Sequence, residues 1–176
     1  STGASSLHTN IYRVAVKNPA TVVTRNGVPL TGLVNNFYYQ FESNTADVIE
    51  ADNPIIVAQI MASAGFCPNN SGGGDPAMVY VSPVEQGIDR VGLYRNTQSA
   101  ITNQYVTLII PTAGLTSLTI DGSNTFDHTY AHNAPGYSVV VKRWNPATNA
   151  QVIVQSDSAF TLITYGLGSV ESYAYN

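Results

Sequence analysis

The chain has 176 residues, with seven Lys and Arg against eleven Asp and Glu and a formal net charge of −4 at pH 7. Charged residues form 10% of the sequence, against roughly 25% in an average soluble domain. So few basic residues exclude the electrostatic footprint that nucleic acid requires, and no stretch approaches the roughly 20 apolar residues of a membrane span. We therefore expect no nucleic-acid partner and no membrane insertion.

Length and cysteine content favour a compact unit held together by its apolar core. A chain of this length fits one domain, or two small β-halves that share a core. Cys67 is the single cysteine, so the chain has no internal disulfide framework. The chain starts at Ser1 without a signal peptide and ends just after its last strand-like run, so we expect a unit excised from a larger protein.

Short runs rich in Val, Ile, Thr and Tyr follow one another along the chain, separated by Asn-Gly, Asp-Gly, Asn-Pro and Gly-rich turns. About a dozen such runs predict an all-β fold, an antiparallel β-sandwich. No long window has the apolar period of a helix, although one helical turn is expected around Asn96–Asn103 or Val84–Gln86. The predicted strands are Ile11–Lys17, Ala20–Thr24, Asn36–Ser43, Asp47–Ala51, Pro54–Ala62, Ala77–Val81, Gly87–Tyr94, Tyr105–Ile110, Ser117–Ile120, Tyr137–Trp144, Gln151–Ser156, Ala159–Tyr165 and Val170–Tyr175.

The second half of the chain repeats the layout of the first. Ala51–Ile60 aligns with Ser156–Tyr165, each an Asp-containing turn that leads into an apolar strand. Upstream, Val22–Gly27 aligns with Leu118–Gly122, each a β-rich run that ends in a tight-turn dipeptide. We predict a duplicated β-unit, with a first half over residues 1–66, a Gly/Pro-rich connecting segment over 67–86 and a second half over 87–176. Such a duplication is more natural for a binding or structural module than for an enzyme.

The repeated Asp-containing turn carries two further expectations. Ile55–Ala58 is continuously apolar, which predicts a central strand covered on both faces. Asp52 and Asp157 are interpreted as turn formers, whose carboxylates accept backbone N–H groups just before the strand.

No pattern of residues predicts catalysis. The chain lacks a Gly-x-Ser-x-Gly motif, Cys67 has no basic neighbour that would lower its pKa, and the acidic residues fall in turns or on strand edges. Three glycines at 72–74 lack the Lys-Ser/Thr of a phosphate loop. In this connecting segment, Asn70 and Asp75 are candidate ligand-binding residues. Because no catalytic pattern is present, we predict that the chain is not an enzyme.

Metal binding is not predicted either. His128 and His132 lie in a segment that predicts loop and strand, where such a spacing separates side chains by about 13 Å, too far for one ion. Asp121, Asn124 and Asp127 offer oxygen ligands, but the run lacks the terminal Glu and the length of a calcium loop. Calcium is the one cofactor that this pattern leaves open, and no other is expected.

Aromatic residues are the remaining candidate binding surface, because Tyr and Trp give rigid amphipathic contact area to sugars and proteins. We predict that Trp144, Tyr130 and Tyr137 contact the ligand, with Trp144 the most exposed, at the tip of an extra hairpin over 142–149. The tyrosines and Trp near strand ends are Tyr38, Tyr39, Tyr94, Tyr130, Tyr137, Trp144, Tyr173 and Tyr175.

Ile49–Gln59, Cys67, Gly74–Met78 and Ser82–Gln86 together resemble the N-terminal type of domain of IgGFc-binding proteins, in the version found in large secreted or surface-anchored proteins of Bacteroidetes. The resemblance covers residues 8 to 176. It implies a β-rich extracellular recognition module without catalytic residues. The antibody ligand recorded in the family name is not transferred to this chain. Cys67 would pair in disulfide-rich members, but this chain has no second cysteine.

The leading hypothesis is a non-catalytic adhesion or recognition module, extracellular or at the cell surface of a bacterium, that binds a glycoprotein, glycan or protein. A carbohydrate-binding module attached to an enzyme is the first alternative, and it predicts a coplanar aromatic platform on one sheet face. A structural spacer that binds nothing is the second.

Overall fold

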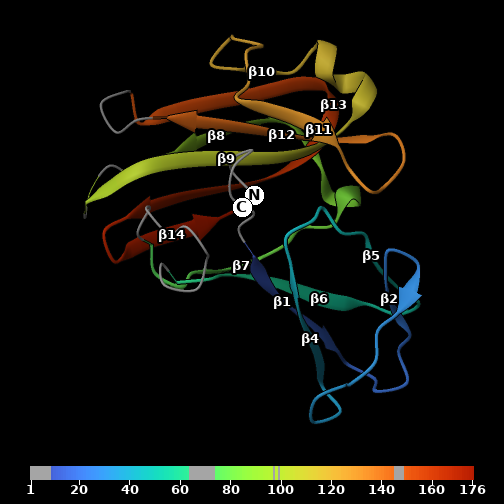
Figure 1. Cartoon of the computed structure of the whole chain (residues 1–176). Coiled ribbons are helices and arrows are strands. Elements are labelled where there is room, and N and C mark those ends of the chain that lie inside the picture. Colours follow the sequence, from blue (N-terminus) through green and yellow to red (C-terminus); the bar gives the residue numbers. More distant parts are fainter. Residues whose placement is uncertain (1–8, 64–73, 97, 99, 145–148) are drawn as a thin grey trace.

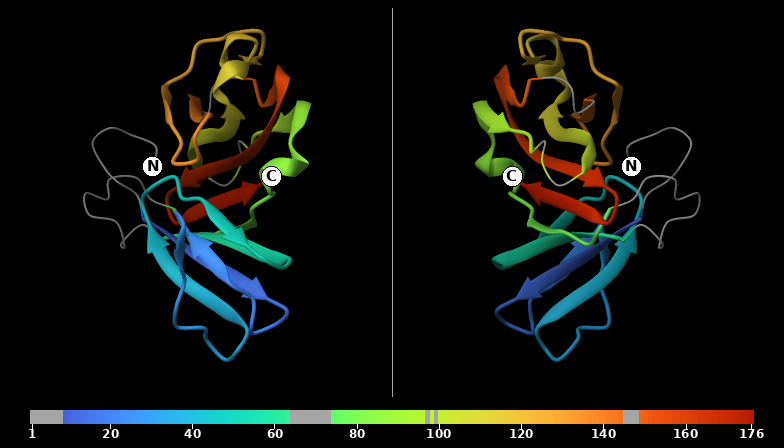
Figure 2. Two further views of the ribbon diagram at one scale, coloured as in Figure 1. Left: turned by 90° about the vertical axis from the view of Figure 1, so that its right-hand side faces the viewer. Right: turned by 90° about the vertical axis from the view of Figure 1, so that its left-hand side faces the viewer.

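The computed structural model describes residues 9–63, 74–96, 98, 100–144 and 149–176. Within them the regular structure is nearly all antiparallel β-strand, which confirms the predicted all-β, sandwich-like fold. The strands form two lobes, and the C-terminus lies where the lobes meet (Figure 1). In the side views of Figure 2, the blue and cyan strands of the first lobe lie below the orange and red strands of the second. No helix in these ranges is long and apolar enough to cross a membrane.

The first lobe consists of two small sheets packed around an apolar core. One sheet has the order β4-β1-β6-β7, with β4 at Tyr38–Ser43, β1 at Asn10–Val16, β6 at Ile55–Met61 and β7 at Met78–Tyr80. The other has the order β3-β2-β5, with β3 at Val28–Pro29, β2 at Val23–Arg25 and β5 at Ile49–Ala51. Val14, Val16, Val23 and Tyr39 are buried between them.

The second lobe is built around one long strand, β13 (Gln151–Gly168). Its first part pairs with β10 (Thr119–Ile120) and β8 (Ile88–Tyr94), and these three strands are called the small layer. Its second part pairs with β14 (Glu171–Tyr175) and β9 (Ile101–Pro111), which continues through β12 (Tyr137–Trp144) to β11 (His128–Ala131) as the large layer. The core between the layers includes Leu108, Ile110, Val152, Val154 and Phe160.

Several predicted elements differ from the structure in ways that have a physical reason. The helical turn at Val84–Gln86 is confirmed as the 3-10 helix η2, whereas β9 already begins at Ile101 in the other predicted turn. A second 3-10 helix, η3 (Thr112–Thr116), was not predicted. The two strands predicted on either side of Asp157 are one strand, because β13 changes pairing partners without ending. β6 is central in its sheet, but Ile56 is 58% exposed, so burial on both faces was wrong.

The two aligned turn dipeptides have the same conformation and make equivalent hydrogen bonds to another segment of the chain. Asn26-Gly27 and Asp121-Gly122 have positive φ at both residues (51° and 78°; 52° and 75°), as in the tight turns of β-hairpins. Asn26 N donates to Val48 O at 2.8 Å, and Asn26 Oδ1 accepts from Val48 N at 2.9 Å. Asp121 exchanges the same two hydrogen bonds with Ile153, both at 2.8 Å.

The sheet orders of the two lobes also correspond. Strands β4-β1-β6-β7 follow the order of β12-β9-β13-β14, whereas β8 and β11 have no equivalent among the described strands of the first lobe. The shared order supports the duplicated β-unit, which stays a prediction. The predicted connecting segment over residues 67–86 also stays a prediction, although β7 lies inside it and pairs with β6 of the first lobe.

The lobes meet at a short segment between β4 and β5. Ala46 packs against Tyr105, Val139 and Val141 on the outer face of the large layer. Its neighbour Asp47 has a side chain only 4% exposed. The Asp47 carboxylate accepts hydrogen bonds from Arg25 Nε at 2.9 Å, Asn26 Nδ2 at 2.8 Å and Thr45 Oγ1 at 2.8 Å. Burial alone would raise the pKa of Asp47, but hydrogen bonds from Ser43, Asn26, Thr45 and Arg25 outweigh it and hold the pKa below its ordinary value of 3.8.

The substitution Asp47→Asn should lower the free energy of unfolding at pH 7 by about 1–3 kcal/mol, because Arg25 loses its ion pair. A carboxyl with a lowered pKa in the folded state stabilises the protein above its unfolded pKa, and this stabilisation is lost as pH falls through the folded pKa. The difference between wild type and Asp47→Asn should therefore shrink between neutral and strongly acidic pH. Urea unfolding at pH 7 and below the unfolded pKa measures it.

The matched control is Glu50→Gln, which removes an exposed carboxylate from β5 and should change stability little at either pH. A stability loss for Asp47→Asn that is equal at both pH values would contradict the role assigned to the carboxylate charge.

Candidate functional site

The outer face of the small layer presents polar and aromatic side chains from two paired strands. On β8, Arg90, Gly92 and Tyr94 alternate with buried or half-buried residues that face the core. They lie opposite Gln155, Ile153 and Gln151 of β13 in the antiparallel register. Tyr94 is 61% exposed and Ile153 is 44% exposed. The face is therefore open, with an aromatic ring at one end and a guanidinium group at the other.

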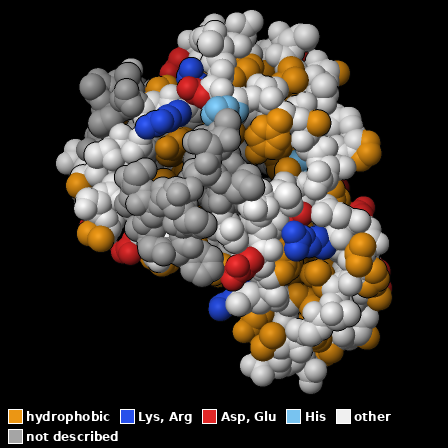
Figure 3. Space-filling model, viewed as in Figure 1, with side chains coloured by type: hydrophobic (Ala, Val, Ile, Leu, Met, Phe, Trp, Pro, Cys, Tyr) orange, Lys and Arg blue, Asp and Glu red, His pale blue; other side chains and the backbone are white. Residues whose placement is uncertain are grey.

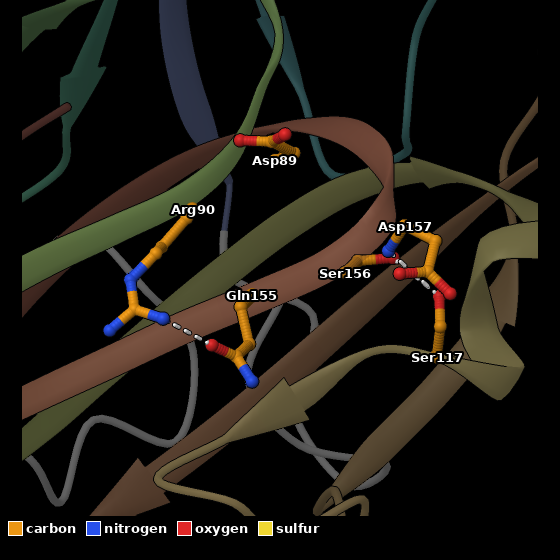
Figure 4. Close-up of a pocket in the computed structure, with 6 residues that line it drawn as sticks. All are labelled: Asp89, Arg90, Ser117, Gln155, Ser156 and Asp157. Atoms are coloured by element: carbon orange, nitrogen blue, oxygen red, sulfur yellow. Dashed lines mark hydrogen bonds between the residues drawn. The ribbon is translucent and has the colours of Figure 1, made fainter.

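A pocket with a volume of about 340 Å³ opens at the Arg90 end of this face (Figure 4). Arg90 Nη1 donates to Gln155 Oε1 at 2.8 Å, so each side chain restrains the other. In Figure 4, Asp157 and Ser117 lie at the far end of the pocket from Arg90. The lining residues are Asp89, Arg90, Ser117, Gln155, Ser156 and Asp157.

The pocket lies where β13 bends from the small layer into the large layer. The register of β13 against β8 shifts between Gln155 and Phe160. Ser156 Oγ donates to Gly114 O at 3.1 Å and accepts from Ser158 N at 3.1 Å, while Asp157 N donates to Ser117 Oγ at 3.0 Å. The bonds from Ser158 N and Asp157 N satisfy backbone N–H groups of β13 at the bend.

The two aspartates of the repeated turn use different atoms. The Asp52 carboxylate accepts a hydrogen bond from Val22 N at 3.0 Å, a backbone group of another segment of the chain, so it bonds across segments and not within its own turn. At the equivalent place, Asp157 bonds to Ser117 through its backbone N–H. The Asp157 side chain is exposed at the pocket.

The described residues that line the pocket offer hydrogen-bonding groups and include no activated nucleophile. The hydroxyls of Ser117 and Ser156 both donate to Gly114 O, and no histidine or cysteine is among the lining residues. A serine needs an adjacent general base to attack a substrate. Carboxylates, a guanidinium and an amide instead supply acceptors and donors to a polar ligand.

The structure corrects the predicted exposure of Trp144. Its side chain is half-buried and packs against the core of the second lobe. The guanidinium carbon of Arg95, a residue only 1% exposed, lies 4.6 Å from the centre of the Trp144 ring. Burial lowers the pKa of Arg95, and its Nη1 donates to the buried Gln104 Oε1 at 2.7 Å. β12 therefore directs Trp144 inward, and its part in ligand binding stays a prediction. Residues 145–148 of the predicted hairpin lie outside the described residues.

The remaining predicted ligand residues do not gather at one place. Tyr130, 41% exposed on β11, and half-buried Tyr137 on β12 share the outer face of the large layer, the face opposite to Trp144. Burial raises the pKa of Tyr130. Asp75 is exposed before β7, and its carbonyl accepts a hydrogen bond from Ser172 Oγ. Asn70 lies outside the described residues.

The three predicted oxygen ligands for calcium lie in separate surroundings. Asp121 Oδ1 accepts from Ile153 N, whereas Asp127 Oδ2 accepts from Arg143 N at 2.8 Å and lies 3.7 Å from Lys142 Nζ. Asn124 is exposed between them. Within the described residues, no group of three or more His, Cys, Asp or Glu side chains could hold a metal ion. Calcium binding at this run stays a prediction.

The pocket residues were not predicted, although the sequence holds a signal for some of them. Ile88–Tyr94 contains Val91 and Leu93 two apart, which sets the core-facing positions and places Arg90 and Tyr94 on the other face. Tyr94 was noted only as one of several aromatics near strand ends. Gln155 and Asp157 could be placed beside Arg90 only with the register of β8 on β13, which the sequence does not specify.

Comparison with known proteins gives one match. The sequence profile of the family described as IgGFc binding protein matches residues 2–166, nearly the whole chain. No curated protein and no solved structure matches the chain significantly.

The substitution Gly114→Ala should disturb the bend that shapes the pocket. A Cβ atom on Gly114 would lie 2.5 Å from Ser158 Cβ and 2.8 Å from Ser158 Oγ, so the bend must shift to accept it. We expect a loss of about 1–3 kcal/mol in the free energy of unfolding, the usual cost of overpacking. Urea unfolding measures it, with Gly92→Ala as the control, because a Cβ there meets nothing within 4 Å. Equal stability of the two variants would contradict the close packing at the bend.

Proposed function

The chain belongs to the IgGFc binding protein family, and we propose that it is a non-catalytic recognition module whose ligand is an extracellular glycoprotein, glycan or protein. The family is one of binding domains, typically extracellular or secreted, and not a known enzyme family. The low charge of the chain supports the same class of function. On the face drawn in Figure 3, charged side chains are few and scattered among polar and hydrophobic ones, which suits neither nucleic acid nor an anionic membrane.

One observation supports the proposed binding surface: an open sheet face adjoins a polar pocket. Tyr94 and Ile153 give the face exposed apolar area, and Arg90, Gln155 and Asp157 give it polar groups. Binding surfaces combine such an aromatic anchor with a few placed polar groups. The proposal therefore assigns ligand contact to the outer face of the small layer.

A bacterial surface or secreted protein is the proposed parent, in which the module serves adhesion. The support for this is the resemblance to adhesin-like proteins and a sequence rich in hydroxyl and amide side chains. A module attached to an enzyme would be expected to offer several coplanar aromatic rings, whereas Tyr94 is the one exposed ring that the paired segments of β8 and β13 place on this face. The binding experiment below distinguishes a recognition module from a spacer that binds nothing.

A second exposed surface serves as a comparison. On the outer face of the β4-β1-β6-β7 sheet, Ile56, Met78 and Tyr80 are between 53% and 59% exposed. None of these three residues lines the polar pocket of Figure 4. Tyr80 and Tyr94 have nearly equal exposure, 59% and 61%, and lie in different lobes. They make a matched pair of sites for substitution.

We expect Tyr94→Ala to weaken binding at least tenfold, because an exposed aromatic anchor contributes a large share of binding energy. Tyr80→Ala should leave the affinity within about twofold. Surface plasmon resonance against immobilised mucin, fibronectin and collagen measures both variants. Thermal unfolding checks that they fold. The backbone N–H and carbonyl of Tyr94, which bond to the Tyr175 hydroxyl, are retained in the alanine variant.

Loss of binding for Tyr80→Ala alone would move the site to the first lobe. Absence of binding to all three probes, and to a glycan array, would favour the spacer and contradict the recognition function.

A further inference from the structure

The polar side chains on the outer face of the small layer share one chemical property. Arg90, Gln151, Gln155 and Asp157 end in planar groups, each with two neighbouring donor or acceptor atoms. Adjacent hydroxyls of a sugar ring present two O–H groups at a similar spacing, and each hydroxyl both donates and accepts. The Arg90–Gln155 hydrogen bond of 2.8 Å fixes two of these side chains before a ligand arrives, which reduces the entropy lost on binding.

The shape of the face suits an extended ligand. Tyr94 and Arg90 are four residues apart on one side of β8, which separates them by about 13 Å. Between them Gly92 has no side chain and lies opposite Ile153, and the space above Gly92 is open. A chain of sugar rings can therefore lie low across the strand, with one ring against Tyr94 and another at the pocket.

The charges around the pocket select against an acidic ligand. Asp89 and Asp157 place two carboxylates on the lining, and Arg90 is the one cation among the six lining residues. A sialic acid or sulfate group would meet net repulsion there. Neutral hydroxyls donate to the carboxylates and accept from the guanidinium and the amide.

A polypeptide ligand fits the same face less well. A specific protein interface covers roughly 800 Å² on each partner around an apolar, aromatic centre. On the paired segments of β8 and β13, the large exposed apolar residues are Ile88, Tyr94 and Ile153, and polar groups surround them. We infer that this face recognises a neutral carbohydrate chain, an inference that rests on the proposed function.

The test uses mucin immobilised in three forms: untreated, desialylated, and oxidised with periodate, which cleaves vicinal diols. The wild-type chain should bind the desialylated form at least as tightly as the untreated form and should lose binding to the oxidised form. Asp157→Asn should weaken binding about tenfold, because hydrogen bonds to a carboxylate are replaced by weaker ones. Tyr94→Phe should retain binding, since a ring contact does not need the hydroxyl. Glu50→Gln, on the other lobe, is the control.

Three results would overturn the inference, in distinguishable ways. Binding that survives periodate but is lost in Tyr94→Ala would identify a polypeptide ligand at the same face and leave the proposed function standing. Binding that requires sialic acid would overturn the neutral class. The third result is no binding to any mucin form, to any member of a neutral-oligosaccharide array, to fibronectin or to collagen. It would overturn the carbohydrate ligand and the proposed function together.

Discussion

The passage of β13 from one layer to the other is the constraint on which the second lobe depends. A single strand that pairs with β8 and β10 and then with β9 and β14 fixes the two layers relative to each other. The bend costs ladder hydrogen bonds, which buried backbone groups must recover elsewhere. The hydroxyls of Ser156 and Ser117 accept from Ser158 N and Asp157 N, and Gly114 lets η3 approach β13 closely. The pocket at this bend is thus a consequence of how the sandwich closes.

A buried cation closes the opposite end of the same sandwich. Arg95 bonds to Gln104 and to the carbonyl of Asn149, and it stacks on Trp144. Burying a guanidinium is costly, and hydrogen bonds with an aromatic face offset part of that cost. This arrangement uses the single Trp of the chain for packing. The proposed binding face relies instead on Tyr94 and polar side chains.

The features that neighbouring residues determine, such as strands and turns, could be predicted from the sequence. The features that depend on strand register could not. Turn dipeptides with positive φ and alternating β-branched runs identified most strands, because both signals lie within a few residues. The exposure of Trp144 was misjudged because Arg95, which lies over its ring, is distant in sequence. The exposure of Ile56 was misjudged because the local sequence does not tell that one face of its sheet is uncovered. The candidate site was missed for the same reason. Arg90 and Gln155 are 65 residues apart and meet only through the pairing of β8 with β13.

Strand β8, which has no equivalent among the described strands of the first lobe, supplies one side of the proposed binding face, and β13 supplies the other. In the described part of the first lobe, the sheet β3-β2-β5 has three strands and nothing in the place of β8. β8 extends the corresponding layer of the second lobe by one strand, and with it come Asp89, Arg90, Gly92 and Tyr94. Its inward residues Val91 and Leu93 join the core, so the strand is held by burial while its outer residues remain free to vary. The proposed binding residues of β8 thus lie on a strand whose outer face is free of core packing.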